Sequence, residues 1–247
     1  DVLEIMDFMR NHLEGTELDM RKDPGAGPYE CPYRWRPMSY QLDGKTYVNE
    51  RATATQQTGF TFVSQSRSWL PNEIGGILWF GVDDAASTVY FPMYTSSVRV
   101  PHAYAVGNGS MMEFTNKAAF WVFNQVTNFA YTRYNIIHPD IREKQKALES
   151  QYKAFVEMVD AGALQTIEQN PRMTIEYLTD FSCNTGNQLV DTWRDFYGYL
   201  FARYMDGNVK TAIPGQQNPK VENPKLPEWY LRTIVNYMGD KQQEVSE

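Results

Sequence analysis

Short stretches that alternate between apolar and polar residues fill the first half of the chain. Residues 53–65 alternate with a period of two, which predicts a β-strand with one buried face. Residues 74–82 are apolar on both faces, as expected of a central strand that lies beneath another layer. This run and residues 88–93 predict a β-hairpin that turns through residues 83–87. A further strand is expected at residues 45–49.

The second half of the chain changes to a helical spacing. Apolar side chains recur at three- and four-residue intervals over residues 116–137, which predicts an amphipathic helix. A second helix is expected to begin at Pro139, because proline is favoured in the first turn, and to reach about Gln169. Residues 172–205 predict a third helix, with an interruption near residues 182–186.

Strands followed by helices are the order of an α+β fold rather than of alternating β-α-β units. We therefore expect a single domain over residues 1–247. Within it, residues 15–114 are expected to be rich in strands and residues 115–206 to be helical. Residues 207–247 are expected to form a proline-rich arm that carries a short helix at residues 228–238.

Composition and charge exclude several classes of protein. The chain has 247 residues, of which 42% are hydrophobic and 14% aromatic, so it can bury a core and is not disordered. Its net charge of −7 gives no basic surface for nucleic acid. No apolar run reaches the ~18 residues that span a membrane. The opening segment DVLEIMDFMRNHLEG is too acidic for a signal peptide and predicts a helix, so the compartment stays open between cytoplasm and periplasm.

Common catalytic motifs are absent from the sequence. It contains no phosphate-binding loop, dinucleotide-binding turn, H-E-x-x-H zinc motif or G-x-S-x-G elbow, so no cofactor and no metal site is expected. Cys31 and Cys183 fit no metal-ligand spacing. They are expected to be two buried free thiols, with one disulfide as the alternative. Cys31 is also a candidate nucleophile, although only Arg34 and Arg36 lie near enough in sequence to lower its pKa.

Several acidic residues and histidines are better explained by structure than by chemistry. Asp19, Asp23 and Asp43 suggest a calcium site, but their glycine-rich surroundings favour turn capping. The pair Asp83–Asp84 is interpreted as the tip of a hairpin. The three histidines stand far apart in sequence and are expected to be structural or exposed to solvent: His12, His102 and His138.

Polar side chains gather on and beside the predicted strands: Asn49, Glu50, Arg51, Gln56, Gln57, Gln65 and Arg67. Arginine binds a carboxylate through two hydrogen bonds, and amides bind the carbonyl groups of a peptide. Four of these residues are therefore candidate substrate-binding residues: Asn49, Arg51, Gln65 and Arg67. Surface pairing, for example of Glu50 with Arg51, is the equally open alternative.

Four blocks of sequence carry a resemblance to a known enzyme family. They read GTELDMRKDPGAGPYECPYRWRP, YVNERATATQQTGFTFVSQSRSWLPNEIGGILWFGVDD, TVYFPMY and AAFWVFNQVTNFAYTRY. In this order they resemble the C-terminal half of the dipeptidase A family, bacterial cysteine dipeptidases that are related to the secernins. That family belongs to the N-terminal-nucleophile hydrolases. The resemblance extends from about residue 15 to 140 and weakens in the helical remainder.

The resemblance implies a four-layer αββα sandwich and the hydrolysis of dipeptides by a cysteine that becomes residue 1 after processing. A free α-amine, with a pKa of ~7.7–8.0, can act as the base for the thiol of its own residue. An acyl-enzyme then forms, an oxyanion hole stabilises the tetrahedral intermediates, and no metal is needed.

This chain departs from the family at its first residue, which is Asp1. Neither cysteine can carry a free α-amine, so we expect the nucleophile on a preceding segment and expect this chain alone to be inactive. Its expected partners are dipeptide substrates and either further copies of itself or the missing N-terminal segment. One alternative is a non-catalytic scaffold or interaction protein derived from the same fold. Another is a periplasmic binder of carbohydrate or peptide, suggested by the 14% of aromatic residues.

Overall fold

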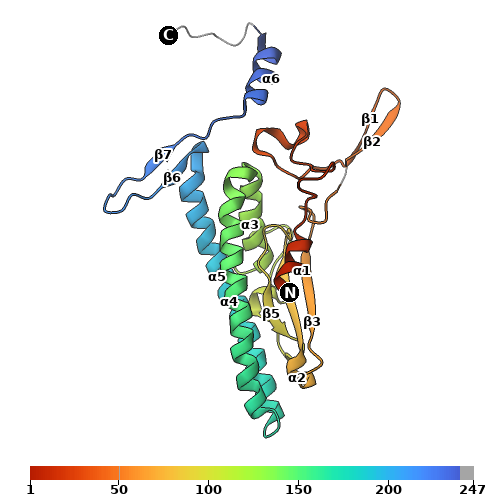
Figure 1. Ribbon diagram of the computed structural model, residues 1–247, viewed down its shortest axis with the longest axis vertical. Coiled ribbons are helices and arrows are strands. Elements are labelled where there is room, and N and C mark those ends of the chain that lie inside the picture. Colours follow the sequence, from red (N-terminus) through yellow and green to blue (C-terminus); the bar gives the residue numbers. More distant parts are fainter. Residues whose placement is uncertain (50, 240–247) are drawn as a thin grey trace.

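A three-stranded antiparallel sheet lies beside three long helices in the computed structural model, which describes residues 1–49 and 51–239 (Figure 1). The sheet has the order β3-β4-β5, with β3 at Phe60–Ser66, β4 at Gly76–Val82 and β5 at Phe91–Tyr94. The helices are α3 (Ala119–Tyr131), α4 (Tyr134–Thr166) and α5 (Pro171–Tyr204). The fold is therefore α+β, as the order of the elements in the sequence predicts.

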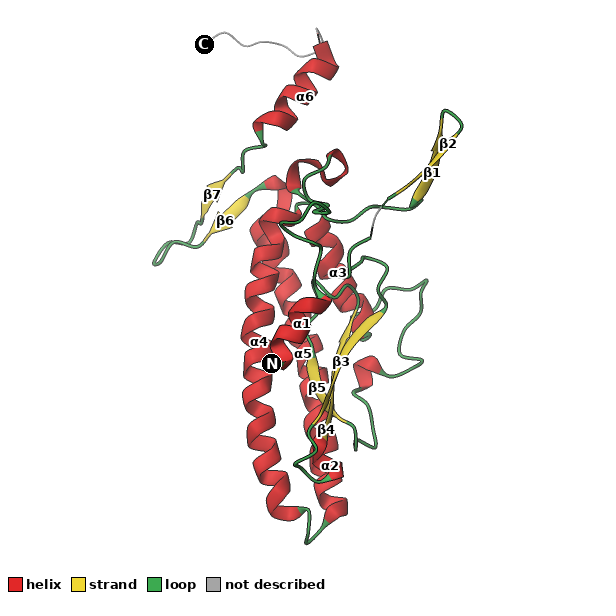
Figure 2. Ribbon diagram, turned by 45° about the vertical axis from the view of Figure 1, so that its right-hand side comes forward, coloured by secondary structure: helices red, strands yellow, loops and turns green. Residues whose placement is uncertain are grey.

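Shorter elements surround this body. Helix α1 (Val2–Met9) contacts β3, and α2 (Asn72–Gly75) lies between β3 and β4 in the chain. Two hairpins project from the body (Figure 2): β1 with β2, and β6 with β7. Their strands are Ser39–Leu42, Lys45–Val48, Val209–Thr211 and Lys220–Glu222. Helix α6 (Glu228–Met238) follows, and short 3-10 helices cover Pro24–Tyr29, His102–Tyr104 and Met205–Gly207.

The two faces of the sheet differ in their surroundings. On one face Val63, Trp79 and Tyr94 are buried, and the Tyr94 hydroxyl donates to Asp160 Oδ1 of α4 at 2.7 Å. Strand β5 also packs closely on α5, because Gly186 leaves no side chain between them. A Cβ at Gly186 would lie 2.8 Å from Phe91, which pairs with Phe80 and therefore lies on the opposite face of the sheet from Trp79 and Tyr94. On the other face the alternation of β3 places Phe60 and Phe62 in solvent, 60% and 49% exposed.

The boundaries of several predicted elements need correction. Strand β3 begins at Phe60 rather than near residue 53, because residues 53–59 form turns and bends. Helix α3 begins at Ala119 and ends at Tyr131, so it is shorter than expected. The strand at Lys45–Val48 and the helix at Glu228–Met238 are confirmed.

Two predictions about the long helices are wrong. Pro139 does not begin a helix but lies inside α4, whose preceding turn buries Tyr134 and Ile137. Their burial outweighs the missing N–H of proline. Helix α5 is not interrupted near residues 182–186. Ser182 Oγ donates to the Leu178 carbonyl oxygen at 2.8 Å and accepts the Tyr94 N–H at 3.1 Å. These small residues bring β5 close to α5 instead of breaking the helix.

Candidate functional site

The loop that joins β4 to β5 is polar and yet buried. Asp83 is 1% exposed, and Asp84, Ser87 and Thr88 are not exposed at all. The sequence predicts a hairpin tip at Asp83–Asp84, and these residues do connect two paired strands, β4 and β5. The structure also buries them. Buried polar groups need partners, and several partners here come from α3, α4 and the segment that follows α1. The hydroxyl oxygens of Ser87 and Thr88 have no partner among the described residues.

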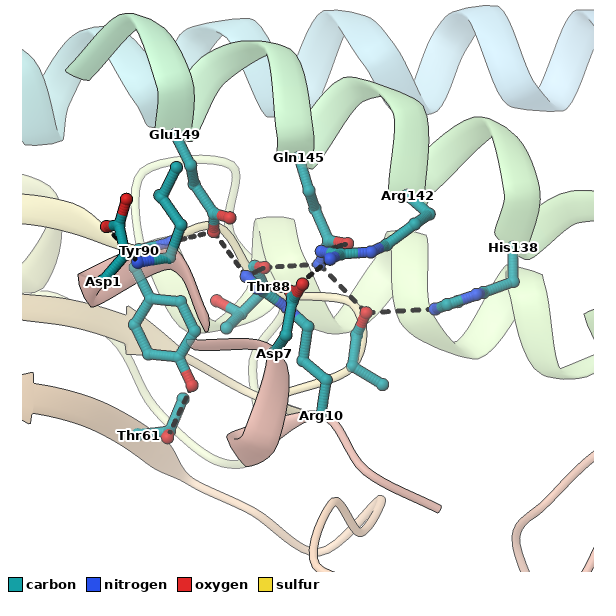
Figure 3. A network of polar contacts seen from close by, with 12 residues as sticks. Asp1, Asp7, Arg10, Thr61, Thr88, Tyr90, His138, Arg142, Gln145 and Glu149 are labelled. Atoms are coloured by element: carbon teal, nitrogen blue, oxygen red, sulfur yellow. Dashed lines mark hydrogen bonds and ion pairs between the residues drawn. The ribbon is translucent and has the colours of Figure 1, made fainter. Parts of the chain in front are cut away.

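Helix α4 supplies three side chains that bind this loop (Figure 3). Gln145 Nε2 donates to the carbonyl oxygens of Ala86 and Thr88 at 2.9 and 2.5 Å. His138 Nε2 lies 3.0 Å from the Ala86 carbonyl oxygen, so it carries the proton. Burial lowers the pKa of His138 to about 4, which keeps the ring neutral at pH 7.

Glu149 is the third α4 side chain, and it forms a buried ion pair with Arg10 (Figure 3). Glu149 Oε1 accepts hydrogen bonds from Arg10 Nη2 and from the Tyr90 N–H, the second at 2.9 Å. Arg10 also donates to the Thr88 carbonyl oxygen at 3.3 Å and lies over the Tyr90 ring. Burial raises the pKa of Glu149, and the charge of Arg10 opposes that rise. The ion pair thus connects α1, the loop and α4.

Asp84 is at the centre of a second group of polar side chains. Asp84 Oδ2 accepts the Tyr131 hydroxyl at 2.9 Å, and Oδ1 accepts the Ala86 N–H at 3.1 Å. Burial raises the pKa of Asp84, while hydrogen bonding to Tyr33 lowers it. The Tyr33 hydroxyl is 2.6 Å from His12 Nε2. A polar chain therefore leads from a histidine through a phenol toward a buried carboxyl.

Asp83 differs from Asp84 in that only one of its carboxyl oxygens is bonded. Oδ1 accepts the Asn124 amide at 2.9 Å, whereas Oδ2 is buried without a hydrogen-bond partner among the described residues. Burial raises the pKa of Asp83 to about 7. The Asp83 carboxyl therefore keeps its proton at pH values where an exposed aspartate is ionised.

Replacing Asp83 with asparagine is expected to stabilise the protein increasingly as the pH rises from 4 to about 7. A carboxyl with a raised pKa binds its proton more tightly in the folded state than in the unfolded state. Between pH 4 and about 7 the unfolded state has lost this proton while the folded state keeps it, so the free energy of unfolding of the wild type falls as the pH rises. The loss is at most about 1.4 kcal/mol for each pH unit. Urea unfolding of both proteins at several pH values measures the difference. Asp195→Asn, at an exposed carboxyl, is the control. A difference that does not change with pH would contradict the raised pKa.

The two cysteines are free thiols and are half-buried rather than fully buried. Cys31 packs against Tyr33, Tyr131 and Tyr134. Burial raises its pKa, Arg34 opposes the rise and Asp84 adds to it. Burial also raises the pKa of Cys183 on α5. Within residues 1–49 and 51–239, no hydrogen bond joins either thiol to a histidine. Neither thiol has the surroundings of an activated nucleophile.

The four substrate-binding candidates lie in separate places. Asn49 follows the β1–β2 hairpin and donates its N–H to the Met38 carbonyl oxygen, and Arg51 is exposed nearby in the chain. Gln65 Oε1 accepts the Trp79 indole N–H at 2.9 Å. Arg67 is buried, forms an ion pair with Asp160 and donates to the Ile74 carbonyl oxygen. Gln65 and Arg67 belong to the end of β3 next to α2, opposite the end that leads to the Asp83 loop.

The turn-capping interpretation of the early aspartates is confirmed for two residues. Asp19 accepts the Gly15 N–H at 2.9 Å, and its hydrogen bonds with Arg21 lower its pKa. Asp23 accepts the Gly25 N–H at 2.7 Å. The described part of the chain has no group of three or more His, Cys, Asp or Glu side chains placed to hold a metal ion. It also has no helix that is long and apolar enough to cross a membrane.

Sequence reasoning missed most of the residues at this site. His12 is buried and His138 is half-buried, and their contacts with Tyr33 and with the Ala86 carbonyl oxygen could not be foreseen. One signal was available. The pair Asp83–Asp84 directly follows a run that is apolar on both faces, and a polar loop that continues a buried strand is itself expected to be buried.

Comparison with known protein families shows to which family the chain belongs. The sequence profile of peptidase family C69 matches residues 1–147, which include the whole sheet, the buried loop, α3 and the start of α4. The chain belongs to peptidase family C69. This membership confirms the relationship to cysteine-type peptidases that the resemblance implied. No curated protein matches the chain.

Proposed function

We propose that this C69 chain is part of a dipeptidase whose nucleophilic cysteine lies outside these 247 residues. Membership in C69 supports cysteine chemistry. The observation that carries the proposal is the surroundings of the two thiols. Neither Cys31 nor Cys183 forms a hydrogen bond with a histidine among the described residues, and burial raises the pKa of both. A catalytic cysteine needs a lowered pKa or an adjacent base.

In the proposed reaction the nucleophile is an N-terminal cysteine. Its free α-amine takes the proton of the thiol, and the thiolate attacks the carbonyl carbon of the dipeptide. The tetrahedral intermediate then expels the amino product, which takes the proton from the α-ammonium, and a thioester remains. Water, deprotonated by the α-amine, attacks this acyl-enzyme, and the second tetrahedral intermediate releases the carboxylic acid and restores the thiol. Hydrogen-bond donors directed at the carbonyl oxygen stabilise the tetrahedral intermediates.

The structure of the sheet supports the proposal that this chain forms half of an αββα sandwich. One face of the sheet packs on helices through Trp79 and Tyr94. The opposite face leaves Phe60 and Phe62 exposed, and Phe60 stacks on Phe80 with ring centroids 5.9 Å apart. An apolar sheet face of this kind is stabilised when a second sheet packs on it at about 10 Å. In the proposed enzyme that second sheet would bring the nucleophile.

We retain the four polar residues as proposed substrate contacts, in two groups. Asn49 and Arg51 lie outside the core, where a guanidinium group can bind the carboxylate of a dipeptide. Gln65 and Arg67 already bond to Trp79 and Asp160, so they would contact substrate only after exchanging those partners. The proposed associations are with dipeptides, with further copies of the chain or with the polypeptide that carries the nucleophile.

The test compares two forms of the protein against a panel of dipeptides in a thiol reductant. The 247-residue chain is expected to show no turnover above a blank. Extending the chain with any in-frame coding sequence that precedes Asp1 is expected to give turnover that iodoacetamide abolishes. Hydrolysis by the 247-residue chain that is lost in Cys31→Ser or Cys183→Ser would overturn the proposal. An extended chain that binds dipeptides in calorimetry without cleaving them would also overturn it.

A further inference from the structure

Strand β3 forms one edge of the sheet (Figure 1). Its only strand neighbour within the described residues is β4, and the seven residues Phe60–Ser66 pair with it without a bulge. Helix α1 contacts β3, but no hydrogen bond between described residues joins the two. The main-chain groups on the far side of β3 therefore stay available for another strand.

The register shows which residues direct their main chain to that free edge. Arg67 N–H bonds to the Gly75 carbonyl oxygen, and Asp83 N–H bonds to the Gly59 carbonyl oxygen. Along an antiparallel ladder, hydrogen-bonded pairs alternate with non-hydrogen-bonded pairs. Because the two bonded pairs involve residues 59 and 67, the odd-numbered residues of β3 are the ones that bond to β4. The even-numbered residues point their N–H and C=O groups outward: Phe60, Phe62, Ser64 and Ser66.

The sequence of this edge offers none of the usual protection against strand pairing. Natural edge strands are kept apart by lysine, proline, bulges or short length. The β3 sequence FTFVSQS has no charge and no proline, and it has seven residues. Phe60 and Phe62 are 60% and 49% exposed on one face beside the edge. An unprotected apolar edge of this kind marks a surface that pairs with another strand.

We propose that two copies of this chain pair through their β3 strands, antiparallel and about a two-fold axis at Val63. In this register Phe62 lies opposite Ser64 of the second copy, and Phe60 lies opposite Ser66 of the second copy. All four are outward-bonding residues, so each pair can exchange two N–H···O=C bonds. The two three-stranded sheets become one continuous six-stranded sheet.

A second copy fits this edge because β3 is complementary to itself. In the Val63-centred register each phenylalanine lies opposite a serine, so large side chains meet small ones across the new strand pair. No charged residue lies within Phe60–Ser66, so no like charges meet. Trp69, in the turn that follows the strand, is 76% exposed, so this end of β3 carries a further exposed aromatic side chain. This inference does not depend on the proposed dipeptidase activity, because no catalytic group takes part in the contact.

The mass of the chain in solution tests the pairing, measured by light scattering over a concentration series. The wild-type chain is expected to reach twice its monomer mass of 28.6 kDa. Ser64→Pro removes an outward N–H without removing a bond to β4, and Phe62→Lys places a charge on the edge. Both variants are expected to be monomers with an unchanged circular dichroism spectrum. Phe114→Lys, at a phenylalanine 55% exposed in a loop, is the control and should remain a dimer.

Crosslinking tests the register. Residues 63 of the two copies form a non-hydrogen-bonded pair, with Cα atoms about 4.5 Å apart, which a disulfide can bridge. In a background of Cys31→Ser and Cys183→Ser, Val63→Cys is therefore expected to oxidise to a covalent dimer. Thr61→Cys, whose opposite residue is Gln65, should not. A monomeric wild-type chain, a dimer that survives Ser64→Pro and Phe62→Lys, or crosslinking at Thr61→Cys alone would overturn the proposal.

Discussion

Replacing Arg10 with methionine is expected to lower the free energy of unfolding by about 3–5 kcal/mol. Arg10 is 7% exposed and pairs with Glu149, which is 3% exposed. Methionine keeps much of the volume but leaves the Glu149 carboxylate buried with the Tyr90 N–H as its remaining hydrogen-bond donor. The cost is the burial of an uncompensated charge. Urea unfolding followed by circular dichroism measures it.

Three controls separate this explanation from a general loss of packing. Arg99→Met removes an exposed pairing with Glu176 and Asp180 and should leave the unfolding midpoint nearly unchanged. The double variant Arg10→Met, Glu149→Leu should be more stable than Arg10→Met alone, because no charge remains buried. If the double variant is no more stable, the ion pair is not the cause.

The pH dependence gives the third control. Burial already raises the pKa of Glu149, and without Arg10 that rise is larger. A carboxyl whose pKa is raised in the folded state destabilises that state as the pH increases above the ordinary pKa of a glutamate. The loss caused by Arg10→Met should therefore be smaller at pH 4.5 than at pH 8. A loss that is equal at both values would contradict the assignment of a charged Glu149.

The elements of this fold follow from local pattern where one principle dominates. The α6 boundaries, Glu228–Met238, follow from a proline before the first turn and a glycine after the last. The β4–β5 hairpin follows from apolar runs on either side of a polar segment. Pro139 shows where this reasoning ends, because the burial of Tyr134 and Ile137 starts α4 before the proline. Long-range packing of this kind leaves no trace in a local window.

The candidate site was less predictable than the fold. Its hydrogen bonds join residues far apart in the chain, such as Arg10 with Glu149 and Tyr131 with Asp84. Sequence spacing cannot place such pairs side by side. Sequence reasoning selected Arg67 as a strand residue that could bind substrate, but the structure buries it against Asp160. Membership in the family indicates cysteine-type peptidase chemistry, whereas only the structure shows where the buried polar side chains lie.

The loop and the sheet edge together suggest how the chain is organised for function. The buried loop around Asp84 is held by hydrogen bonds from Arg10, α3 and α4. The apolar face and free edge of β3, by contrast, are unfinished surfaces. Because a strand pairs along an edge while a sheet packs on a face, the proposed dimer and the proposed sandwich occupy different surfaces of β3. Both associations can therefore coexist.

Replacing Trp193 with alanine is expected to lower the free energy of unfolding by about 3–5 kcal/mol, because it leaves a large cavity in the core. Trp193 is fully buried on α5 and stacks on Phe123 with ring centroids 5.2 Å apart. Its indole N–H has no partner within the described residues, so Trp193→Phe should cost much less, since it removes that unpaired group and keeps the stacking. Trp229→Ala, at a half-exposed tryptophan, is the control. Equal losses for alanine and phenylalanine at position 193 would mean that the N–H is bonded.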